Sequence, residues 1–330
     1  MIDDMRILIT GGVGFIGTNT ASYFAKKNHQ ITIVDNFSRK GVKINVLFLK
    51  KNYPKIKIIK TDVLKIKNYI QDLKKADIII HLAGQTAVTT SIVNPENDFK
   101  NNLLDSFTLL ENIRKYNPKA TLIYSSTNKV YGDLSWMKKF SPVDDDVPLD
   151  FISPYGCSKG AADCYFLDYY RIFGLKTVVF RQSCIYGTHQ LGVEDQGWVA
   201  HFSKQFLFKK PITIFGDGKQ IRDLLYVDDL IEAYEKAILN IDKVKGQAIN
   251  IGGGKTNAYS LLDVIEILKK EFGYSVKIKF DKMRVGDQRY FVSKNKKAKQ
   301  LLKWQPKTPF LKGLKNLISW QKENLSYLKI

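Results

Sequence analysis

Cysteine is scarce in this sequence, which has only Cys157, Cys164 and Cys184 in 330 residues. An odd number of cysteines at these spacings predicts neither a disulfide framework nor a zinc cluster. We therefore expect no bound metal, and a protein that works in the reducing cytoplasm.

Long apolar runs are missing as well. No stretch reaches the roughly 18 consecutive apolar residues that mark a membrane span. The first residues, Met1 to Met5, include two acids and lack the basic region, apolar stretch and cleavage site of a signal peptide. No association with a membrane is expected.

Acidic residues are too few to balance the basic ones: 32 Asp and Glu face 52 Lys and Arg, a formal net charge of +20. The lysines are scattered in pairs such as Lys50-Lys51 and Lys209-Lys210. No basic stripe alternates with aromatic residues, as binding of single-stranded nucleic acid requires. Nucleic acid is therefore not an expected partner. The positive field instead favours an anionic cofactor and a nucleotide-diphosphate substrate.

The apolar residues that are present, 44% of the chain, fall into short strand-like runs separated by helical stretches. The runs cover residues 6–10, 31–35, 56–60, 78–82, 122–126 and 176–181. Buried strands that alternate with helices predict a parallel sheet with right-handed crossovers. The expected fold class is α/β, a Rossmann doubly wound parallel sheet.

This alternation stops after residue 181. Residues 182–220 contain turns and one helical stretch at 198–208, residues 224–239 return to the earlier pattern, and 276–280 is strand-like. We expect the domain that carries this parallel sheet, a Rossmann domain, over 1–182 plus about 222–250. A smaller C-terminal mixed α/β substrate lobe should comprise about 183–221 and 251–330.

A glycine-rich turn joins the first strand to the first helix. Gly11, Gly14 and Gly17 allow a tight turn, close approach of a pyrophosphate and close packing of helix on strand. The free N–H groups of the helix start would receive the phosphates. Asp35 follows Gly14 by 21 residues, at the end of the second strand. A carboxylate there bonds both ribose hydroxyls and repels a 2′-phosphate, so NAD is favoured over NADP, although the nearby Arg39 softens that preference.

Other cofactor contacts are expected along the same edge of the sheet. They are Phe15, Ile16, Asn36, Ser38, Asp62, Val63, Leu82, Ala83, Gly84 and Asn102. The small residues after the fourth strand would let the cofactor lie against the backbone. For Asp62, a helix N-cap is an equally good interpretation of the local sequence.

A tyrosine and a lysine four residues apart share one face of a predicted helix. Ser153 is a good N-cap for this helix, and Pro154 suits its first position. Tyr155 has an ordinary pKa of about 10, too high for a base at neutral pH. A nearby Lys159 ammonium and a cationic nicotinamide would favour the tyrosinate. Tyr155 would then accept a proton from a sugar hydroxyl, while Lys159 also binds the nicotinamide ribose.

Thr127 ends the fifth strand. Its hydroxyl would hold a substrate oxygen beside Tyr155. The alternative is a strand-end hydroxyl that caps a turn.

Together these segments resemble the extended short-chain dehydrogenase/reductase family over nearly the whole chain. The resemblance rests on TGGVGFIG at 10–17, Asp35-Asn36, HLAG at 81–84, YSSTNKVYG at 124–132, SPYGCSK at 153–159 and Arg222-Asp223. It implies a Rossmann lobe, bound NAD, a nucleotide-sugar in the cleft, a homodimer or homotetramer, and a catalytic triad of Thr127, Tyr155 and Lys159. The substrate contacts that it implies are Gln85, Thr127, Asn128, Lys129, Ser183, Gln190, Arg222 and Arg284.

Two positions depart from the family pattern. Related 4,6-dehydratases have an Asp-Glu pair after the catalytic threonine, where this chain has Asn128 and Lys129. Neither side chain can donate a proton to a leaving hydroxide as a carboxylic acid does, so dehydration is disfavoured. Many relatives also have an asparagine near the sugar diphosphate where this chain has Cys184, which leaves the contacts and the substrate orientation there in doubt.

Within the family, the segments at 89–95, 125–134, 153–163 and 195–199 resemble enzymes that invert carbon 2 of a CDP-linked deoxyhexose for lipopolysaccharide O-antigen. We therefore expect epimerisation through a transient keto sugar. A UDP-hexose 4-epimerase is the alternative, and a nucleotide-sugar 4,6-dehydratase is a third. A non-catalytic NAD-binding scaffold is the alternative from another class, but it has no need of Thr127, Tyr155 and Lys159.

The nucleotide end of the substrate is expected near two arginines. Arg222 follows a glycine loop, and Arg284 lies in RVGDQR with Arg289. Arginine offers a planar fork for diphosphate oxygens, but surface ion pairs remain an alternative for Arg284 and Arg289. Trp198 fits the sugar pocket and the core equally well. These residues do not distinguish cytosine from uracil, so the CDP assignment depends on the resemblance alone.

Apolar positions in 99–113 and in the helix after Tyr155 fit two arrangements. They would form an intersubunit helix bundle, or they would simply pack on the sheet.

Overall fold

A parallel sheet of seven strands forms the centre of the computed structural model, which describes residues 4–137 and 140–328. The strand order is β10-β6-β5-β4-β1-β2-β3, and every neighbouring pair is parallel. The strands are β1 (Arg6–Thr10), β2 (Gln30–Asp35), β3 (Lys57–Lys60), β4 (Ile78–His81), β5 (Thr121–Thr127), β6 (Lys176–Gln182) and β10 (Gln247–Ile251). The predicted Rossmann doubly wound sheet is confirmed.

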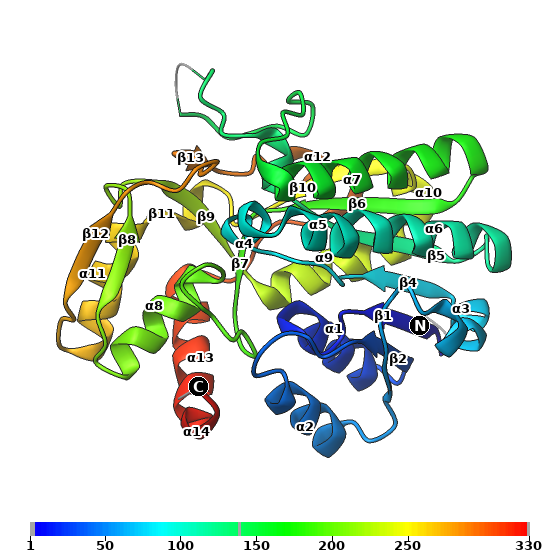
Figure 1. Cartoon of the computed structure of the whole chain (residues 1–330), viewed down its shortest axis with the longest axis horizontal. Helices are drawn as coiled ribbons and strands as arrows, with labels where there is room; N and C mark the ends of the chain where they lie inside the picture. Colours follow the sequence, from blue (N-terminus) through cyan, green and yellow to red (C-terminus); the bar gives the residue numbers. More distant parts are fainter. Residues whose placement is uncertain (1–3, 138–139, 329–330) are drawn as a thin grey trace.

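Helices cover both faces of this sheet (Figure 1). One face carries α1 (Phe15–Lys26), α2 (Lys43–Asn52) and α9 (Val227–Leu239), and the other carries α3 (Ile70–Lys75), α6 (Asp105–Tyr116) and α7 (Ser153–Phe173). Alternate residues of β1 enter the two cores: Ile7 packs in the core that contains Phe24 of α1, and Leu8 in the core that contains Leu109 of α6. Because both faces are buried, the central strands are apolar throughout rather than alternating.

The smaller part of the chain lies beyond the carboxyl ends of the central strands (Figure 1). Its larger sheet joins β7 (Cys184–Tyr186), β9 (Ile221–Tyr226), β11 (Ala258–Ser260) and β13 (Tyr290–Phe291). A separate pair joins β8 (Ile212–Phe215) and β12 (Ile278–Asp281) in parallel. The larger helices here are α8 (Trp198–Leu207), α11 (Leu261–Phe272) and α13 (Phe310–Glu323).

Residues 221–239 are shared between the two parts. β9 pairs with β7, β11 and β13, whereas α9, which follows it directly, packs against α1 of the Rossmann part. β10 then returns to the edge of the central sheet beside β6. The division into two lobes at the predicted boundaries stays a proposal.

Short elements complete the chain. They are the α-helices α4 (Val88–Val93), α5 (Pro95–Phe99), α10 (Ile241–Val244), α12 (Lys296–Leu302) and α14 (Leu325–Leu328), the π-helix η2 (Lys100–Leu104), and the 3₁₀ helices η1 (Ile66–Asn68), η3 (Asn128–Tyr131) and η4 (Lys255–Asn257). Within the described residues, no helix has the length and apolar character to cross a membrane. Over the same residues, no three His, Cys, Asp or Glu side chains gather as a metal site would require.

Candidate active site

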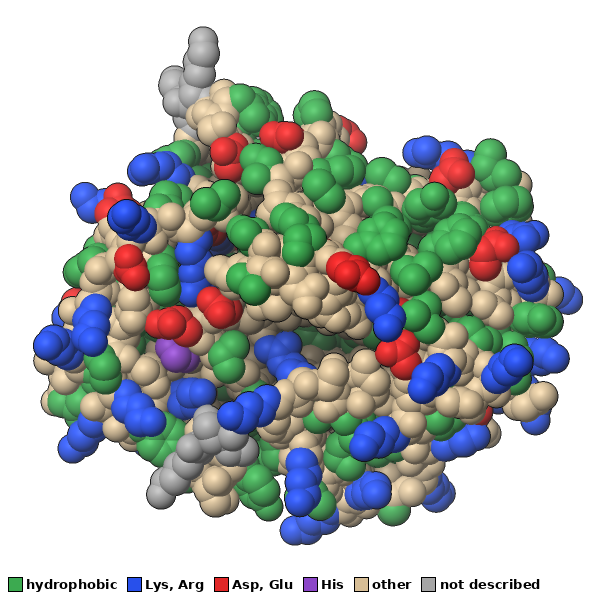
Figure 2. Space-filling model, viewed as in Figure 1, with side chains coloured by type: hydrophobic (Ala, Val, Ile, Leu, Met, Phe, Trp, Pro, Cys, Tyr) green, Lys and Arg blue, Asp and Glu red, His purple; other side chains and the backbone are tan. Residues whose placement is uncertain are grey.

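A cavity of about 320 Å³ opens where the strand order reverses between β1 and β4. Open α/β sheets bind ligands in the crevice at such a switch point. The cavity lies between the ends of the central strands and the smaller sheets. Figure 2 shows this face of the molecule hollowed near its centre, with Lys and Arg side chains in and around the hollow.

The glycine turn packs tightly against its own backbone and against the loop after β4. A Cβ atom on Gly17 would lie 2.3 Å from the carbonyl oxygen of Gly11, and one on Gly11 would lie 2.7 Å from the amide nitrogen of Ala83. Gly11 also has φ +70°, which favours glycine. Gly14 precedes α1 and has no side chain to cap its first N–H groups, so these remain available to a phosphate. Phe15 and Ile16 line the cavity.

Asp35 ends β2 beside this turn. Its carboxylate accepts hydrogen bonds from the amides of Val13 (3.2 Å) and Phe37 (2.8 Å), and burial raises its pKa although these bonds oppose the rise. Asn36 accepts a bond from the Ser38 amide. The carboxylate therefore stands at the edge where the ribose of a dinucleotide is expected.

Arg39 points away from Asp35. Its guanidinium donates to the Thr86 hydroxyl at 3.3 Å and to the Gln196 side chain. Arg39 thus joins the end of β2 to a loop on the far side of the cleft. A contact of Arg39 with the cofactor stays a prediction.

Asp62 caps a turn rather than a helix. Its carboxylate accepts a bond from the Leu64 amide at 2.9 Å, and its other oxygen lies 3.5 Å from the Asn36 amide nitrogen. The adjacent Val63 is buried, and its carbonyl accepts a bond from Tyr69. Asp62 and Asn36 therefore meet at the ends of neighbouring strands, on the edge where further cofactor contacts were predicted.

Leu82, Ala83 and Gly84 follow β4. The amide of Ala83 bonds the Thr10 hydroxyl at 3.3 Å. A Cβ on Gly84 would lie only 2.6 Å from the side-chain oxygen of Asn102, which is buried in the middle of the π-helix η2. π-helical turns are frequent at functional sites.

The first turn of α7 presents Tyr155. Ser153 is the first helical residue in the structure, and its hydroxyl accepts a bond from the Gly156 amide at 3.2 Å, the capping contact expected of it. The Tyr155 amide donates to the Ser91 hydroxyl of α4 at 3.1 Å. A hydrogen bond to α4 therefore also fixes the predicted start of α7.

Lys159 is buried one turn further along α7. Its ammonium donates to the Ser125 carbonyl at 2.5 Å and lies 4.3 Å from the centre of the Tyr124 ring. Burial lowers the pKa of Lys159 to about 7, although Asp163 and Asp98 oppose this. Burial also raises the pKa of Tyr155 to about 12, although the Thr127 hydroxyl beside it opposes the rise. Lys159 therefore loses its proton near neutral pH, whereas the Tyr155 phenol keeps its own there.

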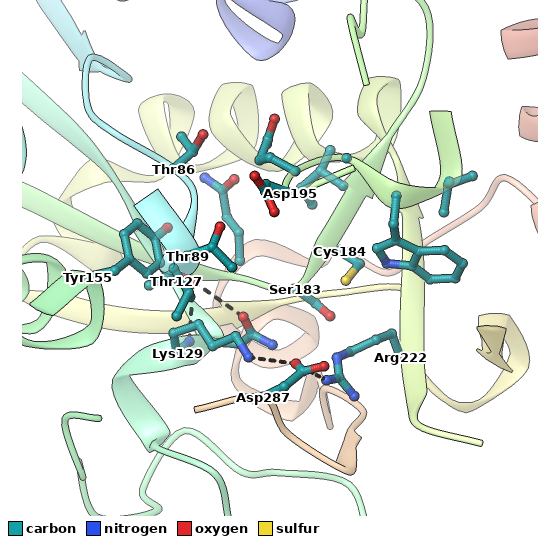
Figure 3. A pocket seen from close by; sticks show the side chains of 18 of the residues that line it. Thr86, Thr89, Thr127, Lys129, Tyr155, Ser183, Cys184, Asp195, Arg222 and Asp287 are labelled. Atoms are coloured by element: carbon teal, nitrogen blue, oxygen red, sulfur yellow. Dashed lines mark hydrogen bonds and ion pairs between the residues drawn. The ribbon is translucent and has the colours of Figure 1, made fainter. Parts of the chain in front are cut away.

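Thr127 lies beside Tyr155 in the cavity, in line with its predicted role (Figure 3). Its hydroxyl also accepts a bond from the Lys129 amide at 3.2 Å and so caps the short helix η3. The two interpretations of Thr127 therefore describe the same side chain, which is held in one orientation by the turn that it caps.

Lys129 and Arg222 share one carboxylate. The Lys129 ammonium lies 3.1 Å and the Arg222 guanidinium 2.8 Å from the same oxygen of Asp287 (Figure 3). Lys129 also donates to the Gly286 carbonyl. Burial lowers the pKa of Lys129, and Asp287 opposes this. The group has one net positive charge and faces the cavity.

Asn128 also binds the segment that carries Asp287. Its side chain donates to Gln288 at 3.0 Å, and Gln288 donates back to the carbonyls of Asn128 and Gly132. The segment 286–288 is therefore fixed on the end of β5. Sequence reasoning missed Gln288, because nothing local marks it as the partner of a residue 160 positions away.

Four further predicted substrate contacts line the cavity. Gln85 folds back onto the Ala87 backbone, Ser183 donates to Asp223, and Gln190 donates to the Ile185 carbonyl. Arg284 pairs with Asp195 at 2.9 Å, and its guanidinium carbon lies 3.8 Å from the centre of the Phe215 ring. Cys184 and Trp198 also face the cavity, whereas Arg289 is exposed outside it.

The structure thus brings the predicted residues into two groups. The substrate contacts and the triad surround the cavity, together with Phe15, Ile16, Leu82 and Gly84. Others lie along the carboxyl edge of β1 to β4 or behind it: Gly11, Gly14, Gly17, Asp35, Asn36, Ser38, Arg39, Asp62, Val63, Ala83 and Asn102. The edge provides glycines, free N–H groups and a carboxylate, a set that fits a dinucleotide.

A sequence model of the NAD dependent epimerase/dehydratase family matches residues 7–252. The chain belongs to this family. Members of the family that resemble the chain over nearly its full length include CDP-paratose 2-epimerase of Salmonella typhi, 41% identical over 335 residues (96% of this chain and 99% of the relative). A putative UDP-glucose 4-epimerase of Methanocaldococcus jannaschii is 32% identical over 319 residues, 96% of this chain and 99% of the relative.

Solved structures of the epimerase/dehydratase family superpose closely. UDP-glucose 4-epimerase of Thermotoga maritima with UDP-glucose gives a TM-score of 0.87 at 30% identity, covering 97% of this chain and 100% of that one. UDP-glucuronic acid 4-epimerase of Bacillus cereus with UDP-glucuronic acid and NAD gives 0.87 at 31% identity, with the same coverage. The protein is therefore an NAD-dependent enzyme of the nucleotide-sugar epimerase/dehydratase type, which confirms the predicted family and cofactor.

Proposed function

We propose that this enzyme inverts carbon 2 of a CDP-linked hexose through a transient 2-keto sugar, as in the interconversion of CDP-paratose and CDP-tyvelose. The observation that carries the proposal is the geometry around Thr127, where an intact Tyr155–Lys159 pair meets a turn without a carboxylic acid donor. The resemblance to a relative named CDP-paratose 2-epimerase supports the choice of carbon and of base.

The proton of the sugar hydroxyl is transferred to the Tyr155–Lys159 pair. When bound, NAD supplies the acceptor for the hydride that leaves the same carbon. Thr127, oriented by the Lys129 amide, holds the sugar oxygen beside the Tyr155 phenol. The pair accepts a proton only after it has lost one, and burial of Lys159 brings that loss near neutral pH. The proton then returns to the ketone oxygen and the hydride to the opposite face of C2, which completes the inversion without net oxidation.

Dehydration is disfavoured by the charges at this turn. Elimination of water needs a carboxylic acid that can protonate the leaving hydroxide. Asp287 is the carboxylate nearest to Lys129, and although burial alone would raise its pKa, the ion pairs with Lys129 and Arg222 hold it below the usual value. Asp287 therefore stays ionised and is bound between two cations.

The cations that line the cavity suit a diphosphate. Arg222 and Lys129 leave one positive charge uncompensated after pairing with Asp287. Arg284 is held by Asp195 and by the Phe215 ring, so its planar guanidinium is already ordered. A nucleotide-diphosphate sugar would place its phosphates among these groups and its sugar near Thr127.

Nuclear magnetic resonance of the purified enzyme with NAD and CDP-paratose or CDP-tyvelose tests the proposal. Interconversion of the two sugars supports it, and a Tyr155→Phe variant should lose nearly all of that rate. Absence of inversion at C2, together with inversion at C4 of UDP-glucose, would assign the enzyme to the 4-epimerases that also resemble it. A keto-deoxysugar product would indicate a 4,6-dehydratase, and a rate unchanged in Tyr155→Phe would remove the mechanism.

We also propose a homodimer or homotetramer with α6 and α7 at a subunit interface. Large apolar side chains of these neighbouring helices are exposed, among them Phe107, Tyr165, Ile172 and Phe173. Apolar side chains gather over this part of the molecule in Figure 2. Exposed patches of this kind usually mark an interface. Phe107→Glu should shift the protein toward a monomer in size-exclusion chromatography with light scattering, and an unchanged mass would count against this interface.

A cytoplasmic location and a role in O-antigen biosynthesis belong to the same proposal. The three cysteines are unpaired, as a reducing compartment would leave them. Detection of the CDP-sugar and its 2-epimer in extracts of cells with the intact gene, and of one epimer alone without it, tests the biosynthetic role.

A further inference from the structure

Asp98 is a buried acid behind the catalytic helix. It lies in the short helix α5, whose other residues are exposed, yet its own side chain is 0% exposed. Its carboxylate accepts hydrogen bonds from the Ser158 hydroxyl and, at 3.0 Å, from the Asn102 side chain. Burial raises the pKa of Asp98, whereas the hydrogen bonds from Ser158 and Asn102 and the charge of Lys159 oppose the rise, so both donors stabilise the charged carboxylate.

Ser158 lies between Tyr155 and Lys159 in the sequence of α7. Its hydroxyl lies 3.2 Å from the Tyr155 carbonyl oxygen and 3.2 Å from the Asn102 amide nitrogen. The bond to Asp98 therefore attaches the turn of α7 that carries both catalytic side chains to α5 and to the π-helix.

The titratable groups around Lys159 come from four elements. Asp163 of α7 is fully buried, but Arg181 of β6 binds it through two bonds, of 2.9 and 3.1 Å. His81 of β4 is uncharged at neutral pH, because burial, together with the charge of Lys159, lowers its pKa to about 3. Tyr124 of β5 is uncharged as well, because burial raises its pKa.

Asp98 of α5 is the remaining charge. Its carboxylate makes no ion pair within residues 4–137 and 140–328. It is therefore a buried negative charge near Lys159 that forms no direct ion pair with a guanidinium or ammonium of the described residues, and it interacts with the Lys159 charge at longer range.

We propose that Asp98 is a positioning residue of the active site, which fixes the first turns of α7 through Ser158 and holds the proton on Lys159 by its buried charge. The role rests on the proposed use of the Tyr155–Lys159 pair as the proton acceptor. A negative charge favours the protonated ammonium, so loss of that charge should let the pair release its first proton at a lower pH.

The Asp98→Asn variant isolates the charge from the hydrogen bonds. The asparagine oxygen can still accept from Asn102, and its amide can donate to the Ser158 oxygen, whose own hydrogen then goes to the Tyr155 carbonyl. Glu96→Gln is the matched control, because it removes one negative charge from an exposed position of the same helix.

The titration of Lys159 can be followed without any sugar substrate. The probe is the holoenzyme with lysines labelled at Cε with carbon-13, in which the Lys159 signal is identified by its loss in Lys159→Arg. Asp98→Asn should lower the Lys159 midpoint by about one pH unit, the lower end of the shift of about one to three units that a nearby opposite charge gives. Glu96→Gln should leave the midpoint in place. An unchanged midpoint in Asp98→Asn would overturn the electrostatic role, whether or not the enzyme acts on a CDP-hexose.

Turnover tests the positioning role separately. The rising limb of the pH–rate profile should move to lower pH in Asp98→Asn by the same amount as the Lys159 midpoint. If that variant does not fold, Ser158→Ala decides the question. Removal of the Ser158–Asp98 hydrogen bond should lower kcat roughly tenfold or more, with little change in KM. An unchanged kcat would contradict the proposal. A wild-type enzyme that leaves CDP-hexoses unchanged would refute the proposed function but not the Lys159 titration.

Discussion

Replacement of Lys159 by methionine should change the pH dependence of the enzyme as well as its rate. With the lysine, the pair loses its first proton near pH 7, because burial lowers the pKa of Lys159 to about 7. Without it, the phenol of Tyr155 has to ionise alone, and burial raises its pKa to about 12. A group with that pKa is ionised in about one molecule in 10⁴ at pH 8.

The positive nicotinamide ring reduces this loss. An opposite charge close to an acid lowers its pKa by about one to three units, roughly two in the middle of that range. Lys159→Met should therefore lower kcat at pH 8 by about 10² to 10⁴. The wild-type rate should rise through about pH 7 and then level off, whereas the rate of the variant should keep rising about tenfold per pH unit up to pH 10.

Steady-state rates from pH 6 to pH 10 with saturating NAD and sugar nucleotide measure both effects. Lys100→Met, which removes an exposed ammonium from the π-helix, is the control and should keep the wild-type profile. If the pH–rate profile of Lys159→Met kept the wild-type shape at a uniformly lower rate, Lys159 would not set the pH at which the site loses its first proton. Lys159 would then have only a role in binding.

Two further substitutions test the cofactor turn and the core behind the site. Gly17→Ala places a Cβ 2.3 Å from the Gly11 carbonyl oxygen, so the turn must open. The affinity for NAD, measured by calorimetry, should fall at least about tenfold, and an unchanged affinity would show that the turn adapts. Arg181→Met leaves the fully buried Asp163 without its partner, which should lower the free energy of unfolding by about 3–5 kcal/mol in urea titrations. A loss below about 1 kcal/mol would mean that Asp163 takes up a proton at little cost.

The sequence predicts the central sheet well, because its inner strands are buried on both faces. Residues 78–81 are Ile-Ile-Ile-His, all buried, and they form β4 in the middle of the sheet. The glycine turn is likewise a local property, since its spacing alone fixes where a backbone can approach a phosphate.

Pairing between distant segments is not a local property. Residues 221–226 are as apolar as a strand of the central sheet, yet β9 joins β7, β11 and β13 instead. Which sheet a strand joins depends on contacts far away in the chain. The strand expected at 276–280 also begins later, at Ile278, where the parallel partner Ile212 starts.

Side-chain direction and burial explain the remaining differences. Arg39 is long and flexible, and its bond to Gln196 across the cleft cannot be inferred from its place after β2. Asp98 lies in the polar segment Asn94-Pro95-Glu96-Asn97-Asp98, which is typical of a surface. It is buried only because α5 packs on α7.

The central claim is that one carbon of the sugar loses a hydride and regains the same hydride from the other face. A CDP-hexose with deuterium at C2, incubated with the enzyme and NAD in ordinary water and followed by nuclear magnetic resonance, tests it most directly. The account predicts that the 2-epimer forms with its deuterium retained at C2. Inversion with loss of the deuterium to solvent, or inversion at another carbon, would contradict it.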